Sequence, residues 1–345
     1  MRAVAVTQPN RVEIVDLPVP EPGRYQALVK TEVAYLCNAT DGKLVAGHFP
    51  GVEKYPLVLG HESAGIVQAV GERVRNFRKG DRAIGGLVLE FADPRYASGW
   101  GGFCEYTLVN DHEAMVEDGV ADEKHGWFES YEIQRTVDSD IPVEEAALLC
   151  TWREVLAAFD DFNLKRGDDV LVFGAGPVGL SFVKFARLLG LGFVGMVDPH
   201  EEKRERARQM GADEAFLPDS DLLNSLANKR GKPLDAVVDA VGSAAIVNAA
   251  LPLIRMAGTV GVYGVIADES ITIEKSRGPY NFNLFVHQWP TRSREAAAQK
   301  PLCEWIRAGK LKASEFVTHE FPVESINDAL ATVKSGKALK VLLRY

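Results

Sequence analysis

Cysteine is scarce and scattered in this sequence: four cysteines occur among 345 residues, at positions 37, 104, 150 and 303. Residues 1–7 read as a short strand and lack the pattern of a secretion signal. A disulfide framework is therefore not expected, and the cysteines are predicted to be buried or to bind a metal. Cytoplasmic localisation follows as the expectation.

Two further absences narrow the class of protein. No run of about 18 apolar residues predicts a membrane span. The formal net charge of −9 argues against a general nucleic-acid binder or a protein of anionic membrane surfaces. A small-molecule substrate requires no such charge bias. The chain also has no repeats or low-complexity tract, and its length suggests two domains.

The first hundred residues are rich in short strand patterns separated by glycine and proline. Strands are predicted at 27–33, 66–70, 83–84 and 103–109, which together suggest a small barrel-like β unit. Residues 111–140 are acidic and carry several aromatic side chains. They are predicted to form a solvated loop with one or two strands; the alternative is a flap over the site or an oligomer contact.

Helical patterning begins near residue 142, and from 169 onwards apolar strands alternate with helices. The predicted strands are 170–173, 193–197, 214–217, 234–239 and 258–264. The predicted helices between them are 180–189, 201–210 and 244–256. This alternation predicts an α/β unit with a parallel sheet and helices on both faces. Helices at 296–308 and 326–335 follow, and a last strand at 338–343 is expected to return to the first domain.

A glycine-rich turn lies between the strand at 170–173 and the following helix. Gly174 permits a tight turn, Gly176 lets a pyrophosphate approach the backbone, and Gly179 lets the helix pack on the strand. Pro177 and Val178 complete this predicted cofactor-binding segment. An ordinary βα turn is the alternative reading.

An acid at the end of the second strand supports the nucleotide reading. Asp198 is placed to accept hydrogen bonds from ribose hydroxyls and to repel a 2′-phosphate, so NAD is favoured over NADP. Lys203 and Arg204 lie nearby and would weaken this preference.

The segment around Gly60 suggests a metal site. His61 and Glu62 are adjacent, and a bend at Gly60 would let both face one point. Cys37 and Cys150 are further ligand types suited to Zn²⁺. Taken singly, each residue has a plainer reading, a hydrogen-bonded loop histidine or a buried thiol, and spacing alone does not join them.

Several motifs occur in the order of a known family. They are Leu36-Cys37 with Thr40-Asp41, residues 56–62 with Gly65 and Gly71, Gly80-Asp81-Arg82, Gly101-Gly102-Phe103, and the 170–179 fingerprint. Over nearly its whole length the chain resembles the zinc-dependent medium-chain dehydrogenases/reductases of the alcohol, polyol and sugar dehydrogenase type. The resemblance implies a GroES-like β-rich catalytic domain at 1–150 and 287–345. It also implies a Rossmann NAD-binding domain at 151–286.

The resemblance also assigns metal ligands. It implies that Cys37 and His61 bind zinc, and that Cys150 occupies a further ligand position. Glu62 matches an acid that binds zinc in polyol and sugar enzymes but lies behind the metal in simple alcohol dehydrogenases. Both possibilities for Glu62 stay open.

Two departures from the family pattern bear on the site. The Cys37 loop is one residue longer than usual, with Thr40 as the expected proton-relay hydroxyl and His48 as a possible end of the relay. Asp41 is expected to orient the loop. Of the four cysteines that bind a structural zinc in many relatives, only Cys104 is present, so one catalytic zinc and no structural zinc are expected.

The implied activity is an NAD- and zinc-dependent interconversion of a secondary alcohol, polyol or sugar with its carbonyl. The alternatives are a simple alcohol dehydrogenase, a zinc-free quinone or enoyl reductase of the same fold, and a non-enzymatic nucleotide-binding protein. Relatives pair through the strand at the end of the Rossmann sheet, which is expected here to be the strand of Tyr263. A homodimer or homotetramer is therefore expected.

Overall fold

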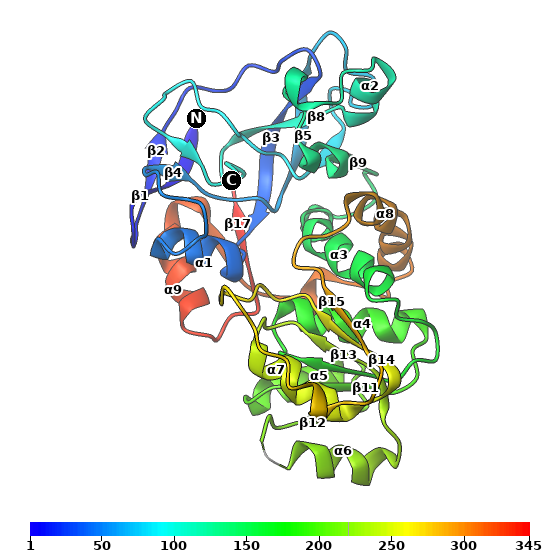
Figure 1. The fold of residues 1–345 in the computed structure, drawn as a ribbon. Helices are drawn as coiled ribbons and strands as arrows, with labels where there is room; N and C mark the ends of the chain where they lie inside the picture. The colour runs from blue at the N-terminus through cyan, green and yellow to red at the C-terminus, as the bar shows by residue number, and fades with distance from the viewer. Residues whose placement is uncertain (220) are drawn as a thin grey trace. The chain divides into compact units, whose positions relative to one another are not determined.

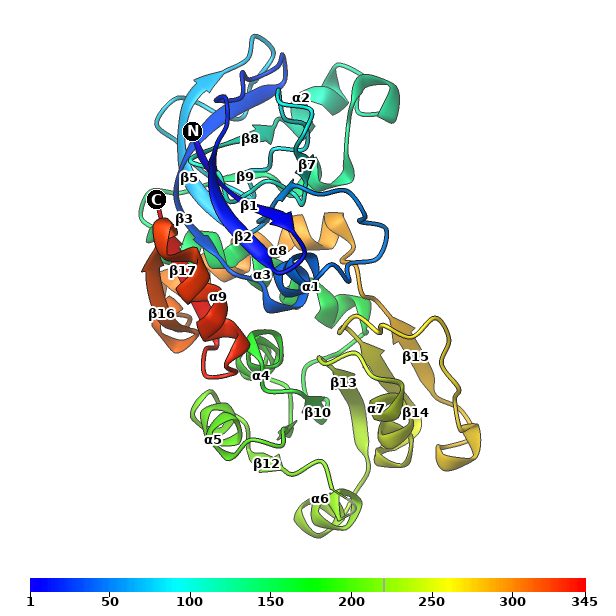
Figure 2. The ribbon, with the colours of Figure 1, turned by 90° about the vertical axis from the view of Figure 1, so that its left-hand side faces the viewer.

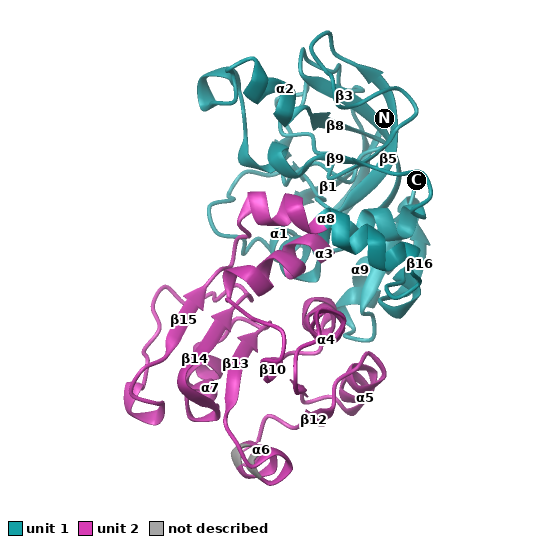
Figure 3. Ribbon diagram, turned by 90° about the vertical axis from the view of Figure 1, so that its right-hand side faces the viewer, with its two compact units in different colours: residues 1–151, 299–345 teal, residues 152–298 magenta. Residues whose placement is uncertain are grey.

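The computed structural model describes residues 1–219 and 221–345, and its internal contacts divide the chain into two compact units (Figure 3). The first unit comprises residues 1–151 and 299–345, and the second comprises residues 152–298. The chain passes between the units within helices α3 (Val143–Asp161) and α8 (Arg292–Arg307). The domain boundaries expected from the sequence were 150/151 and 286/287.

The first unit is built mainly from β-strands, most of which appear in blue and cyan in Figure 1, whereas β17 appears in red. Their bounds are β1 (Arg2–Gln8), β2 (Arg11–Asp16), β3 (Gln26–Tyr35), β4 (Leu57–Val58), β5 (Ser63–Val70), β6 (Arg82–Ile84), β7 (Ala97–Ser98), β8 (Tyr106–Asn110), β9 (Arg135–Val137), β16 (Val317–Pro322) and β17 (Lys340–Arg344). They form a four-stranded sheet ordered β2-β1-β4-β7 and a seven-stranded sheet ordered β16-β17-β3-β5-β6-β9, with β8 on β3. Strand β17 pairs antiparallel with β3, which confirms the predicted return of the terminal strand.

Short helices connect and cover these sheets. They are α1 (Asn38–Ala46), α2 (His112–Glu117) and α9 (Ile326–Lys334), with 3₁₀ turns at Glu123–His125, Glu129–Ile133, Ala313–Glu315 and Val323–Ser325. One apolar cluster packs side chains of β1, β3, β4 and α1 against those of α9 and β17, with Val4, Leu44 and Leu343 fully buried. The C-terminal segment thus completes the core of the first unit.

The second unit contains the predicted parallel sheet. Its strands are β10 (Val170–Phe173), β11 (Val194–Val197), β12 (Glu214–Phe216), β13 (Leu234–Asp239), β14 (Ile254–Val262) and β15 (Asn283–Val286), ordered β12-β11-β10-β13-β14-β15. All neighbouring pairs are parallel. The connecting helices are α4 (Pro177–Leu189), α5 (Glu201–Gln209), α6 (Leu222–Arg230) and α7 (Ala244–Ala250), with 3₁₀ turns at Leu251–Leu253 and Lys275–Arg277 (Figure 2). The prediction of an α/β unit is confirmed.

Two expectations for this sheet were wrong. The helix predicted at 244–256 ends at Ala250, because Pro252 lacks the N–H that a continuing helix needs, and Ile254 already begins β14. The strand expected at the end of the sheet, that of Tyr263, is β14, which pairs with β13 on one side and β15 on the other. The end position belongs to β15. No helix in the described part of the chain is long and apolar enough to cross a membrane.

Candidate metal centre and nucleotide-binding turn

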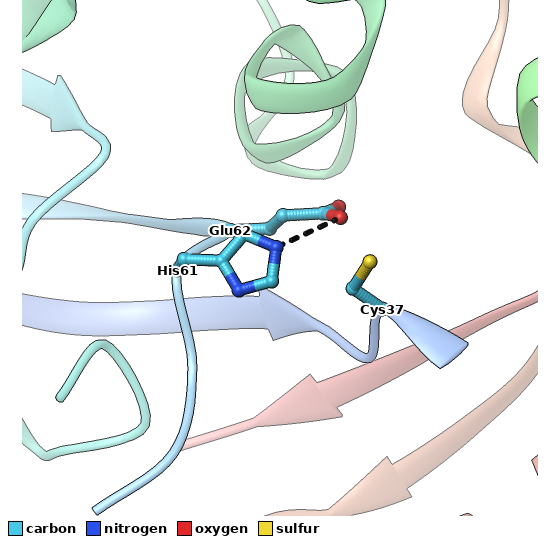
Figure 4. A group of neighbouring side chains, drawn as sticks. All are labelled: Cys37, His61 and Glu62. Atoms are coloured by element: carbon cyan, nitrogen blue, oxygen red, sulfur yellow. Dashed lines mark ion pairs between the residues drawn. The ribbon is translucent and has the colours of Figure 1, made fainter. Parts of the chain in front are cut away.

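Three candidate metal ligands converge in the first unit. Cys37 follows β3 and directly precedes α1, whereas His61 and Glu62 lie between β4 and β5. A sulfur, an imidazole nitrogen and a carboxylate oxygen of these residues lie within 4.8 Å of one another (Figure 4). Gly60 has a φ of +101°, and a Cβ there would lie 2.2 Å from the Phe103 ring. The bend at Gly60 thus occurs in a conformation and a space that favour glycine.

Asp41 contacts the two ligands that come from separate loops. Its Oδ2 accepts a hydrogen bond of 2.8 Å from the Cys37 backbone N–H, and its Oδ1 lies 3.8 Å from His61 Nδ1. Within the described residues, that oxygen and that nitrogen are both buried without a hydrogen-bond partner. A carboxylate facing the second nitrogen of a histidine is the usual way to orient a metal-binding imidazole. Asp41 is therefore placed between Cys37 and His61, and its orienting role stays a prediction.

Glu62 is held by two residues that the sequence did not indicate. Lys340 Nζ donates hydrogen bonds of 2.7 and 2.5 Å to Oε1 and Oε2 of Glu62, and Thr151 Oγ1 donates one of 2.8 Å to Oε2. Burial by itself raises the pKa of Glu62, but Lys340 and these hydrogen bonds hold it below its usual value. The carboxylate is therefore ionised. The one available signal was a lysine inside the otherwise apolar stretch 338–343.

The charges around these ligands fit a cation. Burial raises the pKa of Asp41 to about 6. Burial lowers the pKa of His61, but Cys37, Asp41 and Glu62 outweigh it and raise that pKa to about 10. Thiolate sulfur, imidazole nitrogen and carboxylate oxygen are the donor types that zinc binds. The donor set and its unpartnered buried atoms thus fit a zinc ion.

The other candidate site residues lie outside this group of three. Cys150 is buried in α3, with its Sγ 3.9 Å from the carbonyl oxygen of Ser63. Thr40 is half-buried in α1, and His48 is exposed in the turn after that helix. Their proposed roles in ligation and proton transfer stay predictions.

Trp100 packs beside the candidate metal centre with an unusual backbone. Its φ is +72°, which is rare for a bulky residue, and its ring centroid lies 6.0 Å from that of His61 and 5.3 Å from that of Phe49. Such conformations persist where the surroundings enforce them, commonly at functional sites. No pattern in the sequence indicated this contact.

The glycine-rich turn adopts the conformation its spacing predicts. Gly174 follows β10 with a φ of +94°, and α4 begins at Pro177 with Gly176 as its N-cap. A Cβ at Gly179 would lie 1.7 Å from the carbonyl oxygen of Gly174, whereas one at Gly176 would meet no atom within 4 Å. The turn is thus closely packed at Gly179 and open at Gly176. Strand β10 lies between β11 and β13, where the direction of the strand order reverses, which is the usual nucleotide position in such sheets.

Asp198 directly follows β11 and contacts this turn. Its Oδ2 accepts a hydrogen bond of 2.9 Å from Ala175 N–H, and its Oδ1 accepts one of 2.9 Å from His200 N–H. Arg204 donates to the Asp198 carbonyl oxygen and pairs with Glu201, so its guanidinium is already engaged. Val241 is 55% exposed just beyond β13, leaving apolar surface at the same edge of the sheet.

Comparisons with known proteins agree with this combination of fold and site. Residues 23–117 match the alcohol dehydrogenase GroES-like domain, and residues 177–286 match the zinc-binding dehydrogenase domain. Sorbitol dehydrogenase of Bombyx mori is 26% identical over 355 residues, covering 97% of this chain and 95% of the relative. An alcohol dehydrogenase of Cupriavidus necator is 25% identical over 389 residues, covering 100% of this chain and 98% of the relative.

A solved structure shares the fold over its whole length. It is described as a short chain alcohol dehydrogenase from E. coli CFT073 complexed with NADH, and it superposes with a TM-score of 0.80 at 23% identity, covering 100% of this chain and 99% of the other. Fold and site together define an alcohol-dehydrogenase-type oxidoreductase. The chain belongs to the zinc-type medium-chain dehydrogenase/reductase family.

Proposed function

We propose that this protein is a zinc- and NAD-dependent oxidoreductase that interconverts a secondary alcohol, either a polyol or a sugar, with its carbonyl compound. The observation that carries the proposal is the convergence of Cys37, His61 and Glu62 within 4.8 Å. The same chain also has a dinucleotide-type βα turn. A metal centre and a nucleotide turn are both needed for hydride transfer from a metal-activated alcohol.

The residues of the first unit would prepare the substrate. Cys37, His61 and Glu62 would hold the zinc, with Cys150 as the further ligand that the family resemblance implies. The ion supplies a Lewis acid for the substrate hydroxyl. Asp41 orients Cys37 and His61, and Lys340 fixes Glu62. Thr40 would take the hydroxyl proton and pass it to solvent through His48, whose exposure suits exchange with water.

The second unit would bind the hydride acceptor. The open backbone at Gly176 and the N-terminus of α4 suit a pyrophosphate. The segment 174–179, with Pro177 and Val178, would hold this part of NAD, and Asp198 would accept from the ribose. When bound, NAD would supply the acceptor for the hydride that leaves the carbinol carbon with its electron pair, and Thr40 would take the hydroxyl proton. A negative Asp198 disfavours a 2′-phosphate, so NAD is the proposed cofactor.

A simple alcohol dehydrogenase is the second candidate, and two observations favour it. Both oxygens of Glu62 already accept hydrogen bonds from Lys340, as suits an acid behind the metal rather than a ligand. Phe49 and Trp100 place apolar rings beside His61. We propose that either activity acts on a small molecule, in a cytoplasmic homodimer or homotetramer, with no role for nucleic acid or membrane.

The test combines metal analysis with a substrate screen. Purified protein is expected to contain about one zinc per chain and to produce NADH absorbance with polyols, sugars or simple alcohols. Cys37→Ser should lower turnover by more than about 100-fold, since losing a ligand costs more than losing its supporting residue. NADH binding should persist in this variant.

Cys303→Ser is the matched control, because Cys303 is buried in α8 outside the candidate metal centre. It should keep both zinc and turnover. A fully active, zinc-free wild-type protein would refute the metal-based proposal and favour a zinc-free reductase. Full activity of Cys37→Ser would show that Cys37 is not a ligand.

A further inference from the structure

A glycine-rich segment fixes Trp100 to the part of the chain that carries His61. The backbone N–H groups of Gly99 and Gly101 both donate to the carbonyl oxygen of Val58, at 2.7 and 3.2 Å. Val58 lies three residues before His61. The backbone on either side of Trp100 is therefore bonded to the segment that leads into the candidate metal centre.

A second backbone contact limits the freedom of Trp100 further. Its carbonyl oxygen accepts a hydrogen bond of 3.1 Å from Val88 N–H, and a Cβ on Gly101 would lie only 2.3 Å from the Val88 carbonyl oxygen. The segment is thus bonded to both Val58 and Val88. The φ of +72° at Trp100 persists because these contacts enforce it.

The Trp100 ring makes an apolar contact with His61. The two ring planes are tilted by 56°, and Phe49 packs against the same indole at 77°, edge to face. The nitrogens of His61 face carboxylates instead: Nδ1 lies 3.8 Å from Asp41 and Nε2 lies 3.8 Å from Glu62. The indole therefore packs on the imidazole without taking up either nitrogen.

The two aromatic rings lie at the border of the core. Trp100 and Phe49 pack against the apolar cluster of the first unit but are only half-buried. Asp41 and Glu62 are 1% and 3% exposed, whereas the His61 side chain is 23% exposed. A molecule that approaches His61 from solvent would thus meet aromatic carbon rather than carboxylate oxygen.

Aromatic rings at this position favour one kind of substituent on the carbinol carbon. Phenyl and alkyl groups gain free energy by leaving water and by packing edge to face or offset on such rings. The hydroxyl groups of an open-chain polyol would lose their hydration against aromatic carbon, which costs free energy unless each finds a partner.

We propose that Trp100, together with Phe49, determines substrate specificity by selecting secondary alcohols with a phenyl or alkyl substituent over open-chain polyols. The inference rests on the proposed metal-dependent dehydrogenase activity and names the substrate class of that same site. It favours the simple alcohol over the polyol among the candidate substrates.

The experiment compares kcat/KM for 1-phenylethanol and for sorbitol, which both carry a secondary hydroxyl group, with NAD as the acceptor. Trp100→Asn removes the ring, and asparagine tolerates a positive φ, so the backbone can keep its conformation. Trp100→Phe keeps an aromatic ring. Trp127→Asn is the matched control, because the Trp127 ring centroid lies 5.9 Å from that of His112 in the same unit, outside the candidate metal centre.

Wild-type protein should prefer 1-phenylethanol. Trp100→Asn should lower kcat/KM for 1-phenylethanol roughly tenfold, chiefly through a higher KM, since packing on the ring stabilises the bound substrate and the transition state alike. The value for sorbitol should change less than about threefold, because a polyol gains no such packing. Trp100→Phe should keep most of the preference, and Trp127→Asn should leave both values unchanged.

A second measurement needs no turnover. Ligand-observed NMR titrations without NAD report alcohol binding to the zinc-loaded protein, since no hydride acceptor is present. 1-Phenylethanol should bind the wild type more tightly than Trp100→Asn, by the same factor as the change in KM, while the zinc content of the two proteins stays equal.

Equal losses with both alcohols, or loss of zinc from Trp100→Asn, would overturn the inference, because the ring would then only support His61. A wild type that prefers sorbitol would also overturn it, while leaving the dehydrogenase activity intact. A wild type that contains no zinc and oxidises neither alcohol with NAD would overturn the proposed function, and the inference with it.

Discussion

Glu62 and Lys340 carry opposite charges inside the first unit, where their side chains are only 4% and 5% exposed. Removing one partner of a buried pair leaves the other charge desolvated and uncompensated. Lys340→Met should therefore lower the free energy of unfolding by about 3–5 kcal/mol. Urea denaturation of the chelator-treated protein measures this loss without a contribution from metal binding.

The double variant Glu62→Gln/Lys340→Met tests the cause of that loss. It removes both charges and should regain much of the stability lost in Lys340→Met. Lys337→Met is the matched control, because Lys337 is exposed three residues earlier in the same terminal segment and should change stability little. If Lys340→Met is no less stable than Lys337→Met, the pair does not compensate a buried charge.

At the residue scale, the sequence indicated the candidate ligands better than the groups that hold them. Cys37, His61 and Glu62 were joined by the order of family motifs, since their spacing alone could not bring them together. Lys340 lies 278 positions from Glu62, and no local pattern connects the two. The pairing of β17 with β3 brings the strand of this lysine beside the loop of Cys37.

Asp111, the N-cap residue of helix α2, connects this helix to the loop at Arg75 and Asn76, which precedes β8 in the sequence. Its carboxylate accepts hydrogen bonds from Arg75 N–H, Asn76 N–H, Asn76 Nδ2 and Ala114 N–H, at 2.6, 2.8, 2.7 and 3.1 Å. Asp111→Ala should lower the free energy of unfolding near neutral pH by about 2–4 kcal/mol, since it removes a helix cap and several charge-assisted bonds. Urea denaturation across a pH series measures it.

The pH dependence of this effect has a defined sign. Burial by itself raises the pKa of Asp111, but hydrogen bonds from Asn76, Arg75 and Ala114 hold it below its usual value. The stabilisation is therefore present above the unfolded pKa, about 3.9, and is lost as pH falls through the lower folded value. The gap between wild type and Asp111→Ala should narrow below about pH 4. If the difference in unfolding free energy between wild type and Asp111→Ala stayed constant down to acid unfolding, the carboxylate would not be its source. Asp122→Ala, at the exposed cap of the 3₁₀ turn Glu123–His125, is the control.

At the element scale, the strongly patterned segments were predicted well. Val170–Phe173 and Leu234–Asp239 are short apolar strands, and both were predicted with these bounds. Helix α1 was missed because Asn38, Thr40, Asp41 and Gly42 are weak helix formers, and tertiary contacts such as the burial of Leu44 outweigh that preference. Helix α6 and strand β15 were missed as well, since α6 contains the weak helix formers Asn224, Ser225 and Asn228, and no residue of β15 is buried.

At the scale of the whole molecule, the sequence predicted a β-rich unit and an α/β unit, but not which strands lie next to each other in the parallel sheet. Alternating strands and helices define a parallel sheet, yet they do not say which strand ends it. The assignment to the Tyr263 strand failed because β15 follows a segment of little regular structure and none of its four residues is buried. Strand order is a property of long-range pairing, which local patterns do not encode.

Strand β15 ends the parallel sheet, and this position supports a prediction about assembly. An unpaired edge tends to pair with another chain unless it is charged or covered, and a two-fold axis would join two copies of the same edge. Wild-type protein should therefore show a mass of twice 37.7 kDa, or a multiple of that, by light scattering.

Val286→Lys, at a side chain 50% exposed at the end of β15, should shift the protein towards 37.7 kDa because two lysines would meet near the axis. Val116→Lys, at a side chain 53% exposed in α2, is the matched control and should leave the mass unchanged. A monomeric wild type, or an oligomer that Val286→Lys does not weaken, would exclude assembly through this edge.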